Sequence, residues 1–306
     1  MNITRAFGFI ALCLQVVSAP LESSVFAAEA KALVFGRVQD DAVRAIRDRQ
    51  EFVDYLAKKL RPLGIGSGKI VVVEKLHELA RLIKEGKVDM FHDSVVPTVV
   101  VSKWSGAIPI LRQWKSGEAE YDSAVIVRKS SNIETLVDLK GKVLAFDEPH
   151  STSAHVMARM YLIENKVKLV QMNSTGGAVP NATGFVHGAD GSALNLLMMG
   201  RVDAAVTSSR EFNELRPEVR ETLKIIVKTA PVPRQLIAVR KSLDPKLHRS
   251  LKETMLEMDK DPEGQQVLRR QQKTTKIDAI PPSSMEQLRA VEKFVFSALG
   301  DQVGSW

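Results

Sequence analysis

The sequence predicts an α/β protein built from two lobes of similar topology. Strand-like and helix-like segments alternate along the chain, which is typical of an α/β fold with a largely parallel sheet. Residues 82–89 also resemble residues 196–203, because each segment reads as an apolar helix end, a glycine, a basic residue and then Val-Asp. Chance reuse of a common helix-to-strand connection is the alternative explanation. A chain of 306 residues is long enough for two medium domains, each with a full core.

The first half of the chain supplies one run of elements. The apolar segment 32–36, the β-branched segment 69–74 and residues 88–91 predict strands. Apolar positions between 43 and 60, and again over 76–86, recur at helical spacing, so helices are expected there.

The second half repeats the alternation. Its predicted strands are 125–127, 143–146, 168–172 and 202–207, and its predicted helices are 151–164 and 192–199. Helix starts are also expected at four pairs of capping residues: Ser131 with Glu134, Asp244-Pro245, Asp261-Pro262, and Ser283 with Glu286.

Charge and composition favour a small anionic ligand over nucleic acid. The chain has a net charge of +7, yet its basic residues are interspersed with acidic ones and form no long basic run. Its 44% hydrophobic and 26% charged content is that of an ordinary globular protein. A basic surface of this kind can steer a small anion toward its site. We therefore expect no nucleic-acid partner.

The N-terminus reads as a secretory signal. Arg5 precedes an apolar stretch over 7–17, and small residues gather at 27–30, which predicts a signal peptide of residues 1–28. The apolar stretch is shorter than the roughly 20 residues of a membrane span. The single cysteine, Cys13, lies inside it, so the mature chain would carry no thiol; lipidation at Cys13 is the alternative. We expect an exported, periplasmic protein.

Three consecutive hydroxyl residues follow the strand predicted at 143–146. Ser151, Thr152 and Ser153 stand at the start of a predicted helix, where backbone N–H groups are unpaired and the helix dipole is positive. Such a site suits a tetrahedral oxyanion and requires no metal or other cofactor. The alternative is that one hydroxyl only caps the helix. The six histidines show no metal-ligand spacing, and no nucleophile–base pair indicates an enzyme.

One stretch of the chain contains the segment 138–143, the phenylalanine and proline that follow it, and Ser151-Thr152-Ser153. Together these residues resemble the core motif of the phosphonate-binding proteins of ABC importers. These proteins belong to the wider group that binds phosphate, phosphite and phosphonate. The resemblance extends to Tyr121-Asp122-Ser123, to residues 200–205 and to Pro231-Val232-Pro233.

This resemblance implies a type II periplasmic-binding-protein fold, with a ligand cleft between two α/β lobes joined by crossover strands near 121–127 and 233–239. Lobe 1 would comprise residues 29–124 and 235–306, and lobe 2 residues 125–234. The implied function is to bind phosphonate or a related phosphorus oxyanion and to deliver it to an ABC permease in the membrane. The alternative is a sensory module that docks on a membrane receptor or kinase.

The resemblance assigns phosphonate contacts to Ser151, Thr152 and Ser153. It also places Tyr121 at the lobe junction, where interlobe packing is an equal alternative. Family members that bind aminoalkylphosphonates hold the amine with carboxylates, but this chain has Arg210 and Gln235 at those positions. A ligand with a second anionic group, or a small anion without an amine, is therefore expected.

Three further ligand-binding candidates remain. The resemblance aligns a histidine-containing segment of the family with residues 188–191, which include Asp190, so that histidine is missing here unless His187 or His155 replaces it. Arg37 follows the first strand and His92 the third. Ligand sites in open α/β sheets gather at the carboxyl ends of strands, so both side chains are expected near the cleft.

Overall fold

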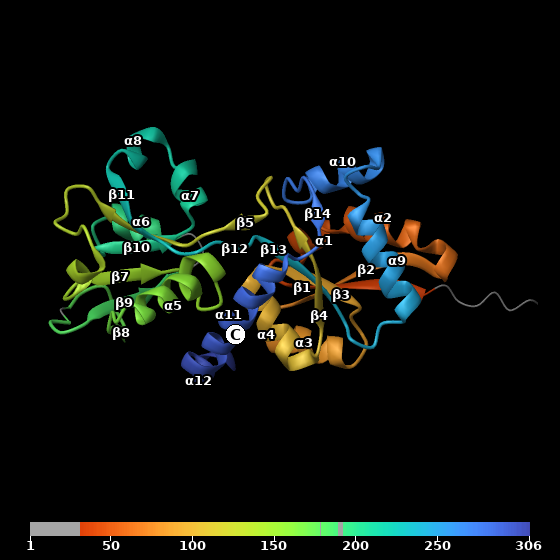
Figure 1. Ribbon diagram of the computed structural model, residues 1–306, viewed down its shortest axis with the longest axis horizontal. Coiled ribbons are helices and arrows are strands. Elements are labelled where there is room, and N and C mark those ends of the chain that lie inside the picture. The colour runs from red at the N-terminus through yellow and green to blue at the C-terminus, as the bar shows by residue number, and fades with distance from the viewer. Residues whose placement is uncertain (1–30, 178, 189–191) are drawn as a thin grey trace, which may run out of the picture.

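The computed structural model describes residues 31–177, 179–188 and 192–306, and it shows two six-stranded sheets set side by side (Figure 1). The predicted signal peptide and Asp190 lie outside the described residues. The α/β class and the two-lobed arrangement predicted from the sequence are confirmed. Within the described part of the chain, no helix is long and apolar enough to cross a membrane.

The first sheet is built from the two ends of the chain. In spatial order its strands are β14 (Ile277–Asp278), β4 (Ile108–Gln113), β13 (Gln235–Val239), β3 (Met90–Asp93), β1 (Lys31–Val38) and β2 (Ile65–Val73). Strand β1 pairs in parallel with β2 and β3, whereas the returning strand β13 pairs antiparallel with β3. We call this sheet with its helices lobe 1.

The second sheet is built from the middle of the chain and forms lobe 2. In spatial order its strands are β11 (Leu223–Lys228), β6 (Ala124–Arg128), β10 (Ala204–Thr207), β7 (Val143–Phe146), β9 (Thr183–His187) and β8 (Leu169–Gln171). Between the lobes, β5 (Glu120–Tyr121) pairs antiparallel with β12 (Val232–Pro233), so the chain crosses twice at one point. The domain boundaries at 124/125 and 234/235 remain predictions.

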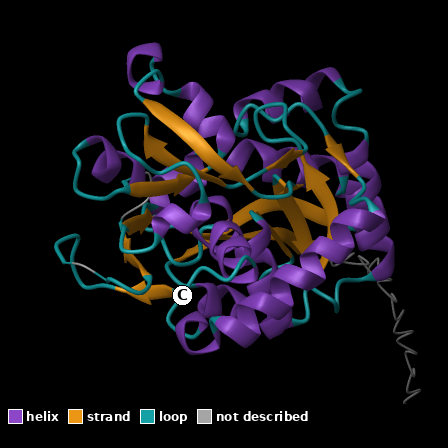
Figure 2. Cartoon of the chain, turned by 60° about the vertical axis from the view of Figure 1, so that its left-hand side comes forward, coloured by secondary structure: helices purple, strands orange, loops and turns teal. Residues whose placement is uncertain are grey.

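Helices pack on both faces of each sheet (Figure 2). Those of lobe 1 are α1 (Ala42–Arg47), α2 (Gln50–Lys59), the 3₁₀ turn η1 (Arg61–Leu63), α3 (Leu76–Lys84), α4 (Val95–Ser105), α9 (Pro245–Leu256), α10 (Pro262–Arg270), α11 (Pro282–Ala298) and α12 (Gly300–Val303). Those of lobe 2 are the 3₁₀ turn η2 (Leu136–Leu139), the π-helical turn η3 (Thr152–Val156), α5 (Met157–Glu164), α6 (Ala193–Met198), α7 (Ser209–Glu214) and α8 (Pro217–Arg220).

The C-terminal segment packs in an apolar cluster that contains residues of both lobes. Trp306, Val303 and Leu299 are buried in one apolar cluster with α3 and α4 of lobe 1, and Val156 and Met157 of lobe 2 belong to the same cluster. The C-terminus accordingly lies beside the lobe junction (Figure 1).

The repeated segment of the sequence is a repeated structure. Gly86 and Gly200 each end a helix with a positive φ, 72° and 69°, which glycine adopts without steric cost. In both copies the next residue donates its N–H to the carbonyl five residues earlier, at 2.9 Å.

The aspartate of each copy fixes a neighbouring strand. Asp89 Oδ2 accepts the N–H of Val34, and Asp203 Oδ2 accepts the N–H of Val143, both at 2.9 Å. The two lobes therefore use the same helix-to-strand connection.

Helix α4 lies at the centre of lobe 1. All seven residues over 95–101 are buried, as expected of a helix that is apolar on every side. The run of β-branched residues favours a strand locally. Ser94 at the N-cap position, and Gly106 at the C-terminus with φ 77°, nevertheless bound a helix.

Two predicted helix starts are wrong. Between β6 and β7 there is only the 3₁₀ turn η2, and its capping box is formed by Thr135 and Asp138 instead of Ser131 and Glu134. Helix α11 begins after Pro281 without a side-chain cap, so Ser283 does not cap it. The two Asp-Pro starts are confirmed.

Replacement of Asp203 tests the repeated connection. Asp203→Ala leaves the Val143 N–H without an acceptor and is expected to lower the free energy of unfolding by about 1–3 kcal/mol. Asp203→Asn retains a carbonyl oxygen and should lose less. Urea unfolding measures both variants; equal losses, or no loss in Asp203→Ala, would contradict this role.

Candidate functional site

Two helices from different lobes begin at the lobe junction. Ser94 precedes α4 in lobe 1, and Ser151 precedes η3, which continues into α5, in lobe 2. Ser151 Oγ accepts the N–H of Ala154 at 3.2 Å, and its carbonyl accepts from Val156 at 3.0 Å in a π-type turn. Such turns often mark functional sites.

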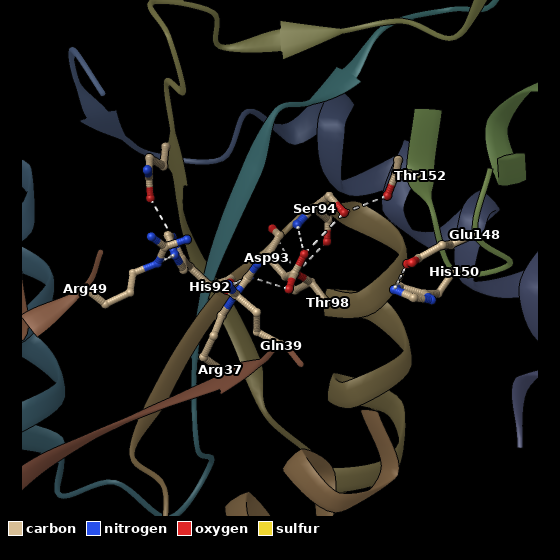
Figure 3. A network of polar contacts seen from close by, with 11 residues as sticks. Arg37, Gln39, Arg49, His92, Asp93, Ser94, Thr98, Glu148, His150 and Thr152 are labelled. Carbon is tan, nitrogen blue, oxygen red and sulfur yellow. Dashed lines mark hydrogen bonds and ion pairs between the residues drawn. The ribbon is translucent and has the colours of Figure 1, made fainter. Parts of the chain in front are cut away.

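Thr152 joins the two helix starts. Its side chain is buried, with 1% exposure; Oγ1 accepts the N–H of Val96 at 2.9 Å and donates to Ser94 Oγ at 3.1 Å (Figure 3). The backbone N–H groups of Val95, Thr152 and Ser153 find no acceptor among the described residues. These N–H groups belong to first turns, where helices cannot satisfy them internally.

A cavity of about 570 Å³ opens at this junction and is lined by both lobes. Its hydroxyl groups come from Ser94 and Ser151, and its cations are Arg37, Arg44, Arg49 and Lys115. Five carboxylates also line it: Asp40, Asp41, Asp48, Glu74 and Glu148.

Arg49 is held in the cavity wall by a buried chain of hydrogen bonds. Its Nε donates to His92 Nε2 at 2.8 Å, so the ring proton of His92 lies on Nδ1 and is donated to Gln113 Oε1 at 2.7 Å (Figure 3). Gln113 in turn donates to Thr274 Oγ1 at 2.6 Å. Burial, followed by the Arg49 charge, holds the pKa of His92 well below its usual value. His92 is therefore neutral and lies behind Arg49.

Arg37 reaches the same wall from β1. Its guanidinium pairs with Asp93 at 2.8 Å, and the other oxygen of Asp93 accepts the N–H of Ser94 at 2.7 Å. The ion pair thus fixes the residue that begins α4.

Tyr121 is buried where the strands cross between the lobes. The Arg234 guanidinium lies 4.3 Å from the centre of its ring, a cation–π contact. Burial raises the pKa of the Tyr121 phenol, and the Arg234 charge and the hydroxyls of Thr152 and Ser153 act against this rise. Ser123 donates its hydroxyl to the Ser153 carbonyl, so this crossing point contacts the Ser151–Ser153 segment directly.

His155 braces the Ser151 segment from inside lobe 2. Its Nδ1–H donates to the Pro149 carbonyl at 2.6 Å, and its Nε2 accepts from Arg159 at 3.3 Å. The His187 ring packs edge-on against it, with centroids 4.6 Å apart. Burial lowers the pKa of His155 to about 3, and the neighbouring His187 adds to the effect. The neutral ring is therefore part of the folded structure.

Some of the predicted site residues line the cavity and others do not. Arg37 and Ser151 line the cavity, whereas Thr152 and Tyr121 are buried beside it. Arg210 does not line it; the Arg210 guanidinium pairs with Glu118 and Glu214.

Gln235 is 6% exposed and lies in β13 beside Gln113, also away from the cavity lining. No pattern in the sequence indicated Arg49 or Lys115 as site residues. A serine between a strand end and a long apolar run was the available signal for Ser94.

A protein-family model matches most of the chain. The model describes the periplasmic substrate-binding protein of phosphonate ABC transporters, and it matches residues 38–284.

Several solved structures share the fold. XAC2383 from Xanthomonas citri, bound to ATP, has a TM-score of 0.80 at 22% identity, covering 90% of this chain and 98% of that one. PhnD1 from Prochlorococcus marinus, in complex with methylphosphonate, has a TM-score of 0.63 at 16% identity, covering 87% and 98%. A binding protein of an ABC phosphonate transporter from Pseudomonas aeruginosa has a TM-score of 0.63 at 18% identity, covering 86% of each chain. At these identities the likeness establishes the fold alone.

Lowering the pH should decrease the free energy of unfolding, because His155 binds a proton more readily in the unfolded chain. Its pKa is about 3 in the folded state and near 6.5 when unfolded, so the unfolded chain binds the extra proton. Stability is therefore complete above pH 6.5 and falls by about 1.4 kcal/mol per pH unit below it, down to the folded pKa. His92 and His187, whose pKa values are also lowered, add slopes of the same sign.

Urea unfolding between pH 7.5 and 5 measures this slope. His155→Asn keeps a donor for the Pro149 carbonyl but cannot titrate, so its slope should be shallower than that of the wild type. Identical slopes would show that His155 does not carry the effect.

Proposed function

Because the family model covers most of the chain, this protein belongs to the periplasmic substrate-binding proteins of phosphonate ABC transporters, and we propose that it holds the phosphonate group between the starts of α4 and η3. Membership of the family establishes a small-molecule binding role in import. The contacts proposed for the ligand are supported by the geometry of the junction.

The single observation that supports this site is that two helix starts, one from each lobe, open into one cavity. Ser94 and Ser151 both line it, and each stands at the positive end of a helix dipole. An anion between two such ends is attracted by both, and it accepts hydrogen bonds from hydroxyl and backbone N–H groups together. A phosphonate offers three oxygens for these donors.

We assign separate roles to the neighbouring residues. Ser94 and Ser151 donate to the phosphonate from the cavity lining. Thr152 and Ser153 follow Ser151 behind the lining, and we assign their backbone N–H groups, which have no acceptor among the described residues, as further donors. The Thr152 hydroxyl links the lobes, since it already bonds to Val96 and Ser94. Tyr121, Arg234 and His92 support the cavity from behind.

Among the charged residues of the lining, Arg37 is linked most directly to the start of α4. Its guanidinium donates to Asp93, and Asp93 accepts the N–H of Ser94. Arg210, which is paired with Glu118 and Glu214, and Gln235, which lies beside Gln113 in the first sheet, have no proposed contact with the ligand.

Ligand binding at this point would favour closure. An anion held by donors from both lobes interacts more strongly with the closed arrangement, so it shifts an open–closed equilibrium toward closure. The closed form would then be recognised by an ABC permease in the membrane. Export through a cleaved signal peptide, and action as a carrier without catalysis, complete the proposed function.

Isothermal titration calorimetry with methylphosphonate, phosphite and phosphate tests the proposal. Ser94→Ala and Ser151→Ala each remove a donor to a charged oxygen, and each should weaken the tightest of these ligands by about tenfold or more. Ser130→Ala, at an exposed serine outside the cavity lining, is the matched control and should bind like the wild type. The lack of binding by all three anions, or unchanged affinity in both site variants, would refute the proposed site.

A further inference from the structure

Lys115 lines the cavity with no partner of its own. It follows β4 in lobe 1, and its ammonium group has no hydrogen-bond or ion-pair partner among the described residues. Lys115 is partly buried, and a partly buried charge without a counter-charge is unfavourable, so an anion bound beside it would be stabilised.

The surroundings of Lys115 are mainly cationic. Arg234, Arg37 and Arg49 all act on its charge, and Asp93 is the carboxylate that opposes them. Asp93 is already paired with Arg37 at 2.8 Å. Desolvation, followed by Arg234, lowers the pKa of Lys115 to about 8, so the ammonium is retained at neutral pH.

The wall that carries Lys115 is held in a strained conformation. Ser116 and Gln272 both have φ of 54°, in the left-handed region, and the Ser116 N–H donates to the Gln272 carbonyl at 3.2 Å. Gln272 also lines the cavity, and its buried Oε1 has no partner within the described part of the chain. Lys115 and Gln272 therefore both line the cavity, and each has a side-chain polar group without a partner among the described residues.

The carboxylates of the lining do not neutralise this wall. Asp48 pairs with Arg44 and Arg47, and Glu148 pairs with His150 at 3.3 Å. Asp40, Asp41 and Glu74 are exposed to solvent. The carboxylates of the lining are therefore either paired already or exposed to solvent.

The cavity has room for more than a phosphonate group. Its volume of about 570 Å³ lies in the range that holds drug-sized ligands, far larger than methylphosphonate. Ser94 and Ser151 provide donors at the helix starts, and Lys115 provides a separate cation on the lobe 1 wall.

We propose that Lys115 binds a second anionic group of the ligand, so that the preferred substrates are phosphonates that also carry a carboxylate or a comparable anion. This inference rests on the proposed function, which places the phosphonate at the helix starts. It makes Lys115 a specificity-determining residue that separates doubly anionic phosphonates from simple alkylphosphonates.

Calorimetry with phosphonoacetate and its uncharged amide, phosphonoacetamide, isolates the second charge, because the two ligands have nearly the same shape. The wild type should bind phosphonoacetate about tenfold or more tightly than the amide. Lys115→Met should bring this ratio close to one, whereas Lys115→Arg should largely retain it. Lys260→Met, at an exposed lysine outside the cavity lining, is the matched control and should keep the wild-type ratio.

Binding of methylphosphonate distinguishes a failure of the inference on Lys115 from a failure of the proposed function. Its binding by Lys115→Met shows that the variant is folded and that the phosphonate site is intact. If methylphosphonate binds but the acid and the amide bind the wild type equally, or if Lys115→Met keeps the wild-type ratio, the inference is refuted and the proposed function stands. Absence of binding by every phosphonate would overturn both.

Discussion

The meeting of two positive helix ends is the constraint on which the site depends. Helices α4 and η3 belong to different lobes; α4 follows β3 closely, and η3 follows β7 after the loop of residues 147–151. Two such ends are unfavourable side by side unless an acceptor lies between them. The Thr152 hydroxyl partly meets this need, because it accepts the Val96 N–H and bonds to Ser94. A phosphorus oxyanion would meet it more fully, which links the closure of the lobes to the chemistry of the ligand.

Each lobe supports its half of the site with a neutral histidine. His92 donates from Nδ1 to Gln113 and accepts from Arg49, while His155 donates from Nδ1 to Pro149 and accepts from Arg159. In both cases protonation would place a second cation against an arginine in a buried space. The same arrangement therefore fixes a cavity arginine in lobe 1 and the loop before Ser151 in lobe 2, without charge on either ring.

The sequence predicted those elements whose signals lie within a few neighbouring residues. The strand at β7, the Asp-Pro helix starts and the glycine–aspartate connection of both lobes follow from side-chain preferences a few residues apart. Helix α4 could not be recognised in this way, since its run of valines favours a strand and only burial on every side explains a helix. Arg49 and Lys115 come together through pairings between distant segments, and no local pattern indicates that they share a cavity.

The most direct measurement is a crystal structure of the protein with methylphosphonate. The account predicts the phosphorus atom between the starts of α4 and η3, with its oxygens within hydrogen-bond distance of Ser94, Ser151 and the N–H groups of Thr152 and Ser153. Density for the ligand elsewhere in the cavity, or contacts to one lobe only, would contradict the account.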